Sequence, residues 1–271
     1  MTPQSLSRPA GSASLSLSRP HSPLLTGGGS GSLDLTYRGF TSSGYRFVRA
    51  LSWLLVLAGV LLLLDTGVTL VWQEPLSALY ARIQQDELGG SLRALDRAQP
   101  APVVRRALEH LPSERDRIAL LALAFQHKAK SGSAIGRIEI PRIGASYVVV
   151  KGVDTADLQK GPGVYSDTNF PGLPGTTAIA GHRTTYLAPF RHIDELRKGN
   201  EIVLEMPYAR FIYTVTSHRS VLPTDVRAAV ANVGYSRLVL SACTPLFSAA
   251  ERLLVFARLS RVVPEGAARR P

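Results

Sequence analysis

The sequence predicts an all-β domain of barrel type, preceded by a membrane-spanning helix and a stalk of surface helices. Residues 50–72 are apolar apart from Asp65 and small hydroxyl side chains. Residues 75–129 carry apolar positions at helical spacing among many charges. Residues 135–263 contain short β-rich runs separated by Gly, Pro, Asp and Asn. Several short strands punctuated by turn residues are typical of a sandwich or barrel, and we expect a barrel.

Composition limits the size and partners of the protein. The 271 residues are 45% hydrophobic and 19% charged, which is enough for one sizeable domain with appendages. Lys and Arg number 31 against 20 Asp and Glu, and the resulting charge of +11 suits an anionic partner. No zinc-finger spacing or aromatic-basic RNA-binding signature accompanies this charge, so we expect no nucleic-acid binding. A single cysteine cannot form an intramolecular disulfide.

The first segments predict a membrane anchor. Residues 1–49 are expected to form a disordered cytoplasmic tail, because their Ser-, Gly- and Pro-rich start can bury little apolar surface. At 1.5 Å per residue, a helix over 50–72 can cross a hydrocarbon layer of about 30 Å. It is too long and too late in the chain for a cleaved signal peptide. Three arginines precede it, at Arg38, Arg46 and Arg49. The positive-inside rule therefore predicts a single-pass cell-membrane protein with an extracellular working domain.

The segments after the span form a stalk, a barrel and a short tail. Residues 73–134 are expected to be an extracytoplasmic helical stalk, broken at Gly89–Gly90 and ending in the linker 130–134. The barrel is expected over 135–263, and a C-terminal tail over 264–271. The predicted strand runs are IGRIEIPRIG, ASYVVVKG, TTAIAGH, NEIVLEM, RFIYTVTSHRSV, RLVLSAC and RLLVFARL.

The only cysteine lies between two of these runs. If strands 237–243 and 252–259 are antiparallel neighbours, the end of the first lies beside the start of the second, so Cys243 and Arg252 are close. Arg258 falls on the same face, but six residues place it about 20 Å further along the strand. A guanidinium beside a thiol favours the thiolate, and beside a reacting carbonyl it can hold an oxyanion.

A thiol that attacks an amide also needs a proton donor for the departing amine, and histidine is the usual choice near neutral pH. His182 ends the run TTAIAGH and opens a long loop, where a side chain can project over a barrel mouth. Residue types alone leave the alternative open. Cys243 could be a small buried hydrophobe, His182 a solvated side chain, and Arg252 the surface partner of Glu251.

Two local signatures resemble a known family. The segments AIAGHRTTYLAPF (178–190) and LVLSACTPLFSAAERLLVFA (238–257), in a β-rich domain behind a membrane anchor, resemble the sortases. The likeness is greatest to the actinobacterial class E housekeeping group and covers about 135–263. It implies a closed eight-stranded β-barrel and a cysteine transpeptidase that needs no cofactor.

The resemblance implies roles for three residues. Cys243 would attack the threonine carbonyl of a C-terminal Leu-Pro-x-Thr-Gly or Leu-Ala-x-Thr-Gly sorting signal, His182 would protonate the leaving glycine amine, and Arg252 would steady the substrate and the oxyanion. A peptidoglycan precursor or cross-bridge amine would then accept the surface protein. Two alternatives stay open: a pilin-polymerising sortase with a lysine acceptor, and a non-catalytic, membrane-tethered β-domain that binds wall polymers or partner proteins.

The nucleophile strand departs from the family pattern. Sortases commonly carry Thr-Leu-x-Thr-Cys, and here Val239 and Ala242 replace the two threonines. The loss of the hydroxyl before the cysteine affects the expected efficiency and signal preference more than the reaction class. We expect Ala242, Thr244, Tyr186 and Tyr165 to contribute to substrate binding.

The expected partners are surface proteins with a sorting signal, a peptidoglycan amine and the lipid bilayer. No metal site is expected. Asp154, Asp157 and Asp167 lie among turn residues, but their spacing does not match the calcium-loop template.

Overall fold

The computed structural model describes residues 42–71, 75–225 and 227–269. Most of the predicted tail, 1–49, falls outside these ranges. Helix α1 (Ser42–Val71) begins before the predicted span, and its stretch Gly44–Val68 has a mean hydropathy of 2.4. In the described part of the chain it is the one helix long and apolar enough to cross a membrane. The prediction of such a helix before the barrel is confirmed.

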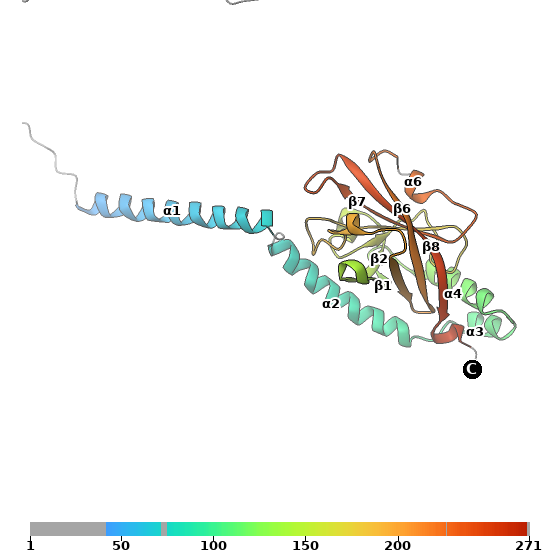
Figure 1. The fold of residues 1–271 in the computed structure, drawn as a ribbon. Helices are drawn as coiled ribbons and strands as arrows, with labels where there is room; N and C mark the ends of the chain where they lie inside the picture. Colours follow the sequence, from blue (N-terminus) through green and yellow to red (C-terminus); the bar gives the residue numbers. More distant parts are fainter. Residues whose placement is uncertain (1–41, 72–74, 226, 270–271) are drawn as a thin grey trace, which may run out of the picture. The chain divides into compact units, whose positions relative to one another are not determined.

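Three helices lie between α1 and the first strand (Figure 1). They are α2 (Pro75–Arg97), α3 (Pro102–Glu109) and α4 (Glu114–Lys128). The predicted break at Gly89–Gly90 is absent, because α2 runs through both glycines. Helix α4 starts where the side chain of Ser113 accepts a hydrogen bond from the Arg115 backbone N–H at 3.2 Å, an ordinary N-cap.

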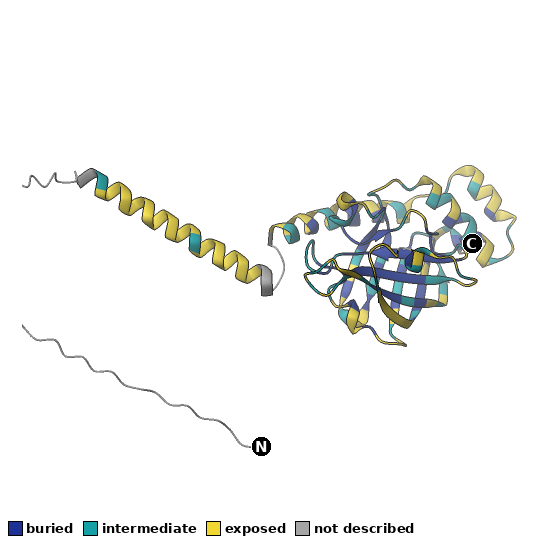
Figure 2. Cartoon of the chain, turned by 90° about the horizontal axis from the view of Figure 1, so that it is seen from above, coloured by how far each residue is buried: buried dark blue, intermediate teal, exposed yellow. Residues whose placement is uncertain are grey.

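The helices of the predicted stalk pack on the barrel instead of standing apart from it. Leu88 and Leu92 of α2 form a buried cluster with Val148 and Val150, and α4 contributes to the main core (Figure 2). Burial of one apolar stripe is what stabilises a surface helix of this length. The apolar positions of these helices therefore belong to the same folded body as the strands.

Eight strands close into a barrel in the order β1-β2-β3-β4-β7-β8-β6-β5, with β5 pairing back to β1 (Figure 1). This confirms the predicted fold class. The β2/β3 and β4/β7 pairs are parallel, and the other pairs are antiparallel. The strands are β1 (Ala134–Ile140), β2 (Ala145–Lys151), β3 (Gly163–Val164), β4 (Thr176–Ala180), β5 (Glu201–Met206), β6 (Ala209–Val221), β7 (Arg237–Thr244) and β8 (Glu251–Pro264).

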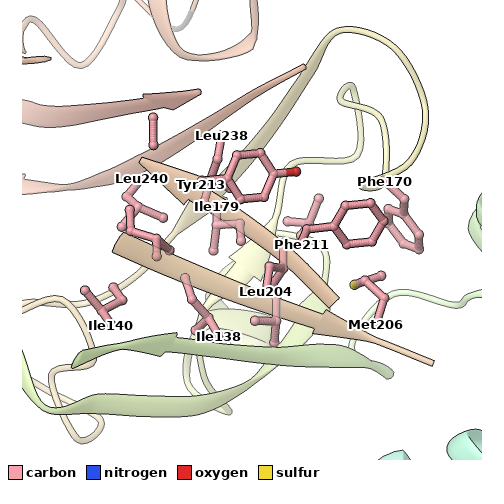
Figure 3. Close-up of a cluster of buried hydrophobic side chains, with 14 of the residues drawn as sticks. Ile138, Ile140, Phe170, Ile179, Leu204, Met206, Phe211, Tyr213, Leu238 and Leu240 are labelled. Atoms are coloured by element: carbon pink, nitrogen blue, oxygen red, sulfur yellow. The ribbon is translucent and has the colours of Figure 1, made fainter. Parts of the chain in front are cut away.

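Short helical turns join the strands. They are η1 (Pro141–Ile143), α5 (Thr155–Leu158), η2 (Ile193–Glu195), α6 (Arg227–Val230) and, after β8, η3 (Gly266–Ala268). The inward-facing side chains of the strands fill the barrel (Figure 3), with Ile138, Phe211 and Leu238 among those that are fully buried. Filling by alternate side chains is the usual state of a small barrel, whose interior is a packed core and not a channel.

A side chain completes the barrel where one strand is too short. Strand β3 pairs only with Val150 and Lys151 of β2, which leaves the edge of β2 at Val148 without a strand partner. Gln85 of α2 accepts from the Val148 N–H at 2.7 Å and donates to the Val148 carbonyl at 3.0 Å. Its amide thereby replaces one rung of a strand ladder, which satisfies two buried backbone groups.

Candidate active site

Strand β7 separates the barrel core from the candidate site. Leu238, Leu240 and Ala242 point into the main core. Val239 points to the other face, where it packs with Ala178 of β4 and Leu254 of β8. Successive side chains of a strand alternate between its faces, so Cys243 lies on the outer face, at the end of β7.

Cys243 lies directly opposite Arg252 in the antiparallel β7/β8 pair. Opposite residues have Cβ atoms about 4.5–5.5 Å apart and share a face, so the guanidinium can reach the thiol. Both residues are half-buried, and Cys243 is a free thiol. Arg252 donates through Nη1 to the carbonyls of Ala249 and Glu251, each at 3.1 Å. Arg258, in contrast, pairs with Arg237 at the other end of the two strands.

The parallel β4/β7 pair brings His182 to the same end of the sheet. Ala180 lies opposite Ser241, and the Gly181 N–H donates to the Ser241 carbonyl at 3.0 Å. Gly181 has no room for a side chain, because an added Cβ would lie 2.6 Å from the Phe190 ring. Two residues beyond the Ala180–Ser241 pair, His182 follows the end of β4 and Cys243 lies near the end of β7, so both are at the same rim.

Burial sets the protonation of His182. Its Nε2 is covered and has no hydrogen-bond partner among the described residues. Removal from water lowers the pKa of the imidazole below its usual value. The neutral ring is therefore favoured near pH 7, and the protonated ring, once formed, is a stronger acid than a solvated histidine.

Arg183 ties the histidine loop to the cysteine strand. Its side chain is 5% exposed, and its Nη2 pairs with Asp194 at 2.8 Å. Nε and Nη2 also donate to the Arg191 carbonyl, at 3.1 and 3.0 Å. Nη1 lies 3.4 Å from both the Cys243 carbonyl and the Thr244 hydroxyl. A buried guanidinium with this many acceptors fixes the separation of the two segments.

The loop after His182 is held in an uncommon conformation. Tyr186, Leu187 and Ala188 have φ values of 49°, 64° and 43°, a left-handed region that non-glycine residues rarely occupy. Such outliers persist only where surrounding contacts impose them. Helix α2 supplies some of these contacts: the Ser77 hydroxyl accepts from the Tyr186 N–H at 3.3 Å, and Tyr80 meets the Tyr186 ring edge-on at 6.4 Å between centroids.

The four residues expected to bind substrate occupy different environments. The Tyr186 ring lies 5.3 Å from the His182 ring, between centroids. Tyr165 packs on the outer-face cluster that includes Val239 of β7. Thr244 is half-buried beside Arg183. Ala242 differs, because its side chain is 3% exposed and lies in the barrel core, which leaves only its backbone for a substrate contact.

Sequence reasoning missed Arg183 and the contacts of α2. Arg183 directly follows His182 in the quoted signature, but residue type alone suggests a solvated surface arginine. Ser77 and Tyr80 lie more than 100 residues before the loop that they contact, and no local pattern connects them. The long loop itself was a usable signal, since loops at a rigid rim often carry function.

Known proteins resemble the barrel region. The sortase domain family matches residues 138–260. Sortase D of Bacillus subtilis is 35% identical over 118 residues, which cover 44% of this chain and 58% of that protein. Sortase SrtE1 of Streptomyces coelicolor is 28% identical over 144 residues, 47% of this chain and 41% of that protein. The chain thus spans about half the length of these relatives.

Two solved sortase structures are similar to this chain. Sortase E of Streptomyces avermitilis is 32% identical and matches 52% of this chain and 99% of that one, with a TM-score of 0.46. Sortase C of Clostridium perfringens SM101 has a TM-score of 0.51 at 18% identity, covers 65% of this chain and 99% of that one, and shows the likeness of fold. The family match and the identity to Sortase D show that residues 138–260 are a sortase domain.

Proposed function

We propose that this chain is a membrane-anchored cysteine transpeptidase that cleaves a Leu-Pro-x-Thr-Gly or Leu-Ala-x-Thr-Gly signal between Thr and Gly. It then transfers the threonyl acyl group to an amine of the cell wall. One observation carries this proposal: Cys243 and Arg252 are paired on the outer face of the barrel, at the rim where His182 leaves β4. A sulfur nucleophile, a fixed cation and an imidazole are the groups that acyl transfer from an amide requires.

The first step forms a thioester. The Cys243 thiolate attacks the threonine carbonyl carbon, and the carbonyl oxygen becomes an oxyanion that the Arg252 guanidinium stabilises. As the intermediate collapses, the C–N bond breaks and protonated His182 gives its proton to the departing glycine amine. The low pKa that burial imposes on His182 favours this donation.

The second step regenerates the enzyme. A neutral amine attacks the thioester carbon, His182 takes the proton that the amine loses, and the C–S bond breaks to release the Cys243 thiolate. The acceptor in this proposal is a peptidoglycan precursor or cross-bridge amine. A lysine of a pilin subunit would follow the same steps, so only direct competition between the two amines separates them.

The non-catalytic alternative requires Cys243 to be a core residue. Cys243 is instead a half-buried free thiol on the face opposite Leu240 and Ala242 of the main core. Cys243 belongs neither to that core nor to the buried outer-face cluster of Ala178, Val239 and Leu254. This placement supports the catalytic proposal over a β-domain that only binds polymers.

The decisive experiment uses the full chain with fluorogenic Leu-Ala-x-Thr-Gly and Leu-Pro-x-Thr-Gly peptides. Cys243→Ala should abolish cleavage, and mass spectrometry should detect an acyl-enzyme that carries the peptide up to threonine. Arg252→Lys and His182→Ala should each reduce kcat/KM by about 10²-fold or more with the fold intact. Competition between a cross-bridge peptide and a lysine peptide identifies the preferred acceptor. Full activity of Cys243→Ala would overturn the proposal.

The anchor and its orientation are part of the proposal. Gly44–Val68 would span the membrane with the N-terminus in the cytoplasm and the barrel outside. Because Cys243 is the only cysteine of the chain, a membrane-impermeant maleimide reports the side of the membrane on which the site lies. Intact cells should be labelled, and Cys243→Ala cells should not. Labelling only after lysis would reverse the orientation.

A further inference from the structure

A second site lies at the other end of strand β8 from Arg252. Helices α3 and α4 and the turn η3 gather at this end of the barrel (Figure 1). They enclose a cavity of about 970 Å³ together with the end of α2. Pro264 lies twelve positions after Arg252 in the strand, a path of about 40 Å. This cavity is therefore separate from the transpeptidase rim, and its capacity to bind a ligand does not depend on the proposed function.

The cavity wall has an excess of positive charge. Four arginines contribute to it, from α2, α3, α4 and the C-terminal segment: Arg97, Arg105, Arg117 and Arg269. Asp96 and Glu109 are the two acids of the wall. Burial raises the pKa of Asp96. A concave surface with this balance concentrates anions.

Arg117 is a buried cation without an acidic partner. It is 4% exposed, and its Nε and Nη1 donate to the carbonyls of Ala268, Leu111 and Pro112 at 3.1, 3.2 and 3.3 Å. Its Nη2 has no hydrogen-bond acceptor, and none of the ion pairs among the described residues includes it. A buried charge ordinarily has a counter-charge, because desolvation without one is costly. Nη2 itself is covered, so an anion in the adjoining cavity would act on the guanidinium as a nearby counter-charge.

An apolar pocket of about 270 Å³ adjoins the charged cavity. The two share the wall formed by Asp96, by 98–100 and by Gly266 and Ala267. Apart from Lys128 and Tyr208, apolar side chains line the rest of the pocket, among them Leu95, Leu121 and Phe125. This pocket has room for one ring or short apolar chain.

We propose that this double cavity binds a soluble organic anion: one phosphate or carboxylate group, held by the arginines, attached to a single compact apolar group in the pocket of Leu121 and Phe125. Each half of the site selects one half of the ligand. The anion provides charge-assisted hydrogen bonds, and the apolar group provides burial. Neither inorganic phosphate nor a neutral apolar molecule satisfies both.

The test is calorimetric titration of the full chain, held in neutral-lipid nanodiscs, with phenyl phosphate, inorganic phosphate and phenol. Phenyl phosphate should bind at least tenfold more tightly than either fragment. Arg105→Ala should weaken it about tenfold, whereas Arg106→Ala, an equal charge change on the neighbouring exposed residue of α3 outside the cavity, should have little effect.

Two further variants and a lipid control complete the experiment. Arg117→Gln should also weaken binding, and Arg105→Ala carries the test if Arg117→Gln fails to fold. Leu121→Ala should lower the affinity for phenyl phosphate and leave inorganic phosphate unchanged. Equal effects of Arg105→Ala and Arg106→Ala would overturn the proposed site, because they would show that only the overall charge of the protein matters. Competition by phosphatidic acid added to the nanodiscs would overturn the soluble ligand and assign the cavity to a lipid headgroup.

Discussion

The two faces of strand β7 differ in role: the inner face packs in the core, and the outer face presents the thiol. On the inner face Leu238, Leu240 and Ala242 are at most 3% exposed and form part of the main core. On the outer face the side chains pass from buried Val239 to half-buried Cys243. One strand thus holds the barrel together and presents the thiol, and the parity of a residue number decides which property a substitution changes. Substitutions on either face, and in the loop that contacts the strand, should test whether stability and catalysis are divided in this way.

The inner face should govern stability. Leu240→Ala removes a side chain that is 0% exposed and should lower the free energy of unfolding by about 2–5 kcal/mol. Cys243→Ala, three positions along on the other face, should change it by about 0.5 kcal/mol or less. Urea denaturation of the two variants provides the comparison. Equal losses would show that the thiol is also a core group.

The contacts of Arg183 with the end of β7 should govern turnover. Arg183→Ala removes the contacts that set the spacing of His182 and Cys243, and kcat should fall by about 10²-fold while KM changes little, because a misplacement of about 1 Å suffices for such a loss. Arg183→Lys should recover part of kcat. Lys198→Ala, an exposed change in the same loop, is the control. A rise in KM alone would mean that Arg183 binds substrate instead of positioning the site.

Restoring the family threonine should cost stability without improving catalysis. Ala242→Thr places a larger side chain and a hydroxyl in a filled core, so the free energy of unfolding should fall by about 1–3 kcal/mol. The rate with sorting peptides should stay within about twofold, because the added hydroxyl lies on the inner face of β7, away from Cys243. A higher kcat/KM at unchanged stability would place the hydroxyl on the substrate side.

His182 should add a small pH dependence to stability. Its folded pKa is lowered by burial, whereas the unfolded imidazole titrates near its ordinary value of about 6.5. The unfolded state therefore binds the proton first, and this contribution is present above about pH 6.5 and is lost as the pH falls through the folded pKa. Denaturation of the protein and of His182→Gln at pH 8 and pH 5 should show a smaller acid loss for the variant. The exposed His218→Gln is the control; an identical pH dependence in His182→Gln would contradict the burial effect.

The sequence predicted what local chemistry determines. Cys243 and Arg252 lie on consecutive strands, so an antiparallel hairpin brings them together without any knowledge of the rest of the fold. Alternation and turn residues located the strand runs, although one run, 135–144, is interrupted by the helical turn η1. The barrel and the family followed from the order of these runs and from two short motifs.

What the sequence did not show depends on distant contacts. Strands β4 and β7 are parallel neighbours separated by more than 50 residues, so the meeting of His182 with Cys243 rested on family resemblance and not on spacing. Gln85 and Arg183 are residue types that usually face water, and only the three-dimensional structure shows them paired with backbone. An apolar stripe on α2 likewise indicates burial but not the strand that it covers.

Closure of the barrel also limits how an extended peptide can bind to its strands. Proteins that capture peptides by lengthening a sheet need a row of free backbone donors and acceptors along one border. In this barrel β5 returns to β1, and an amide from α2 occupies the one gap described beside β2. A guest segment therefore cannot add a strand at this edge of β2, so contacts with its side chains contribute more to its recognition. The selectivity of the barrel for peptides can therefore be changed by a few substitutions in the loops at its rim, without any change in the strands.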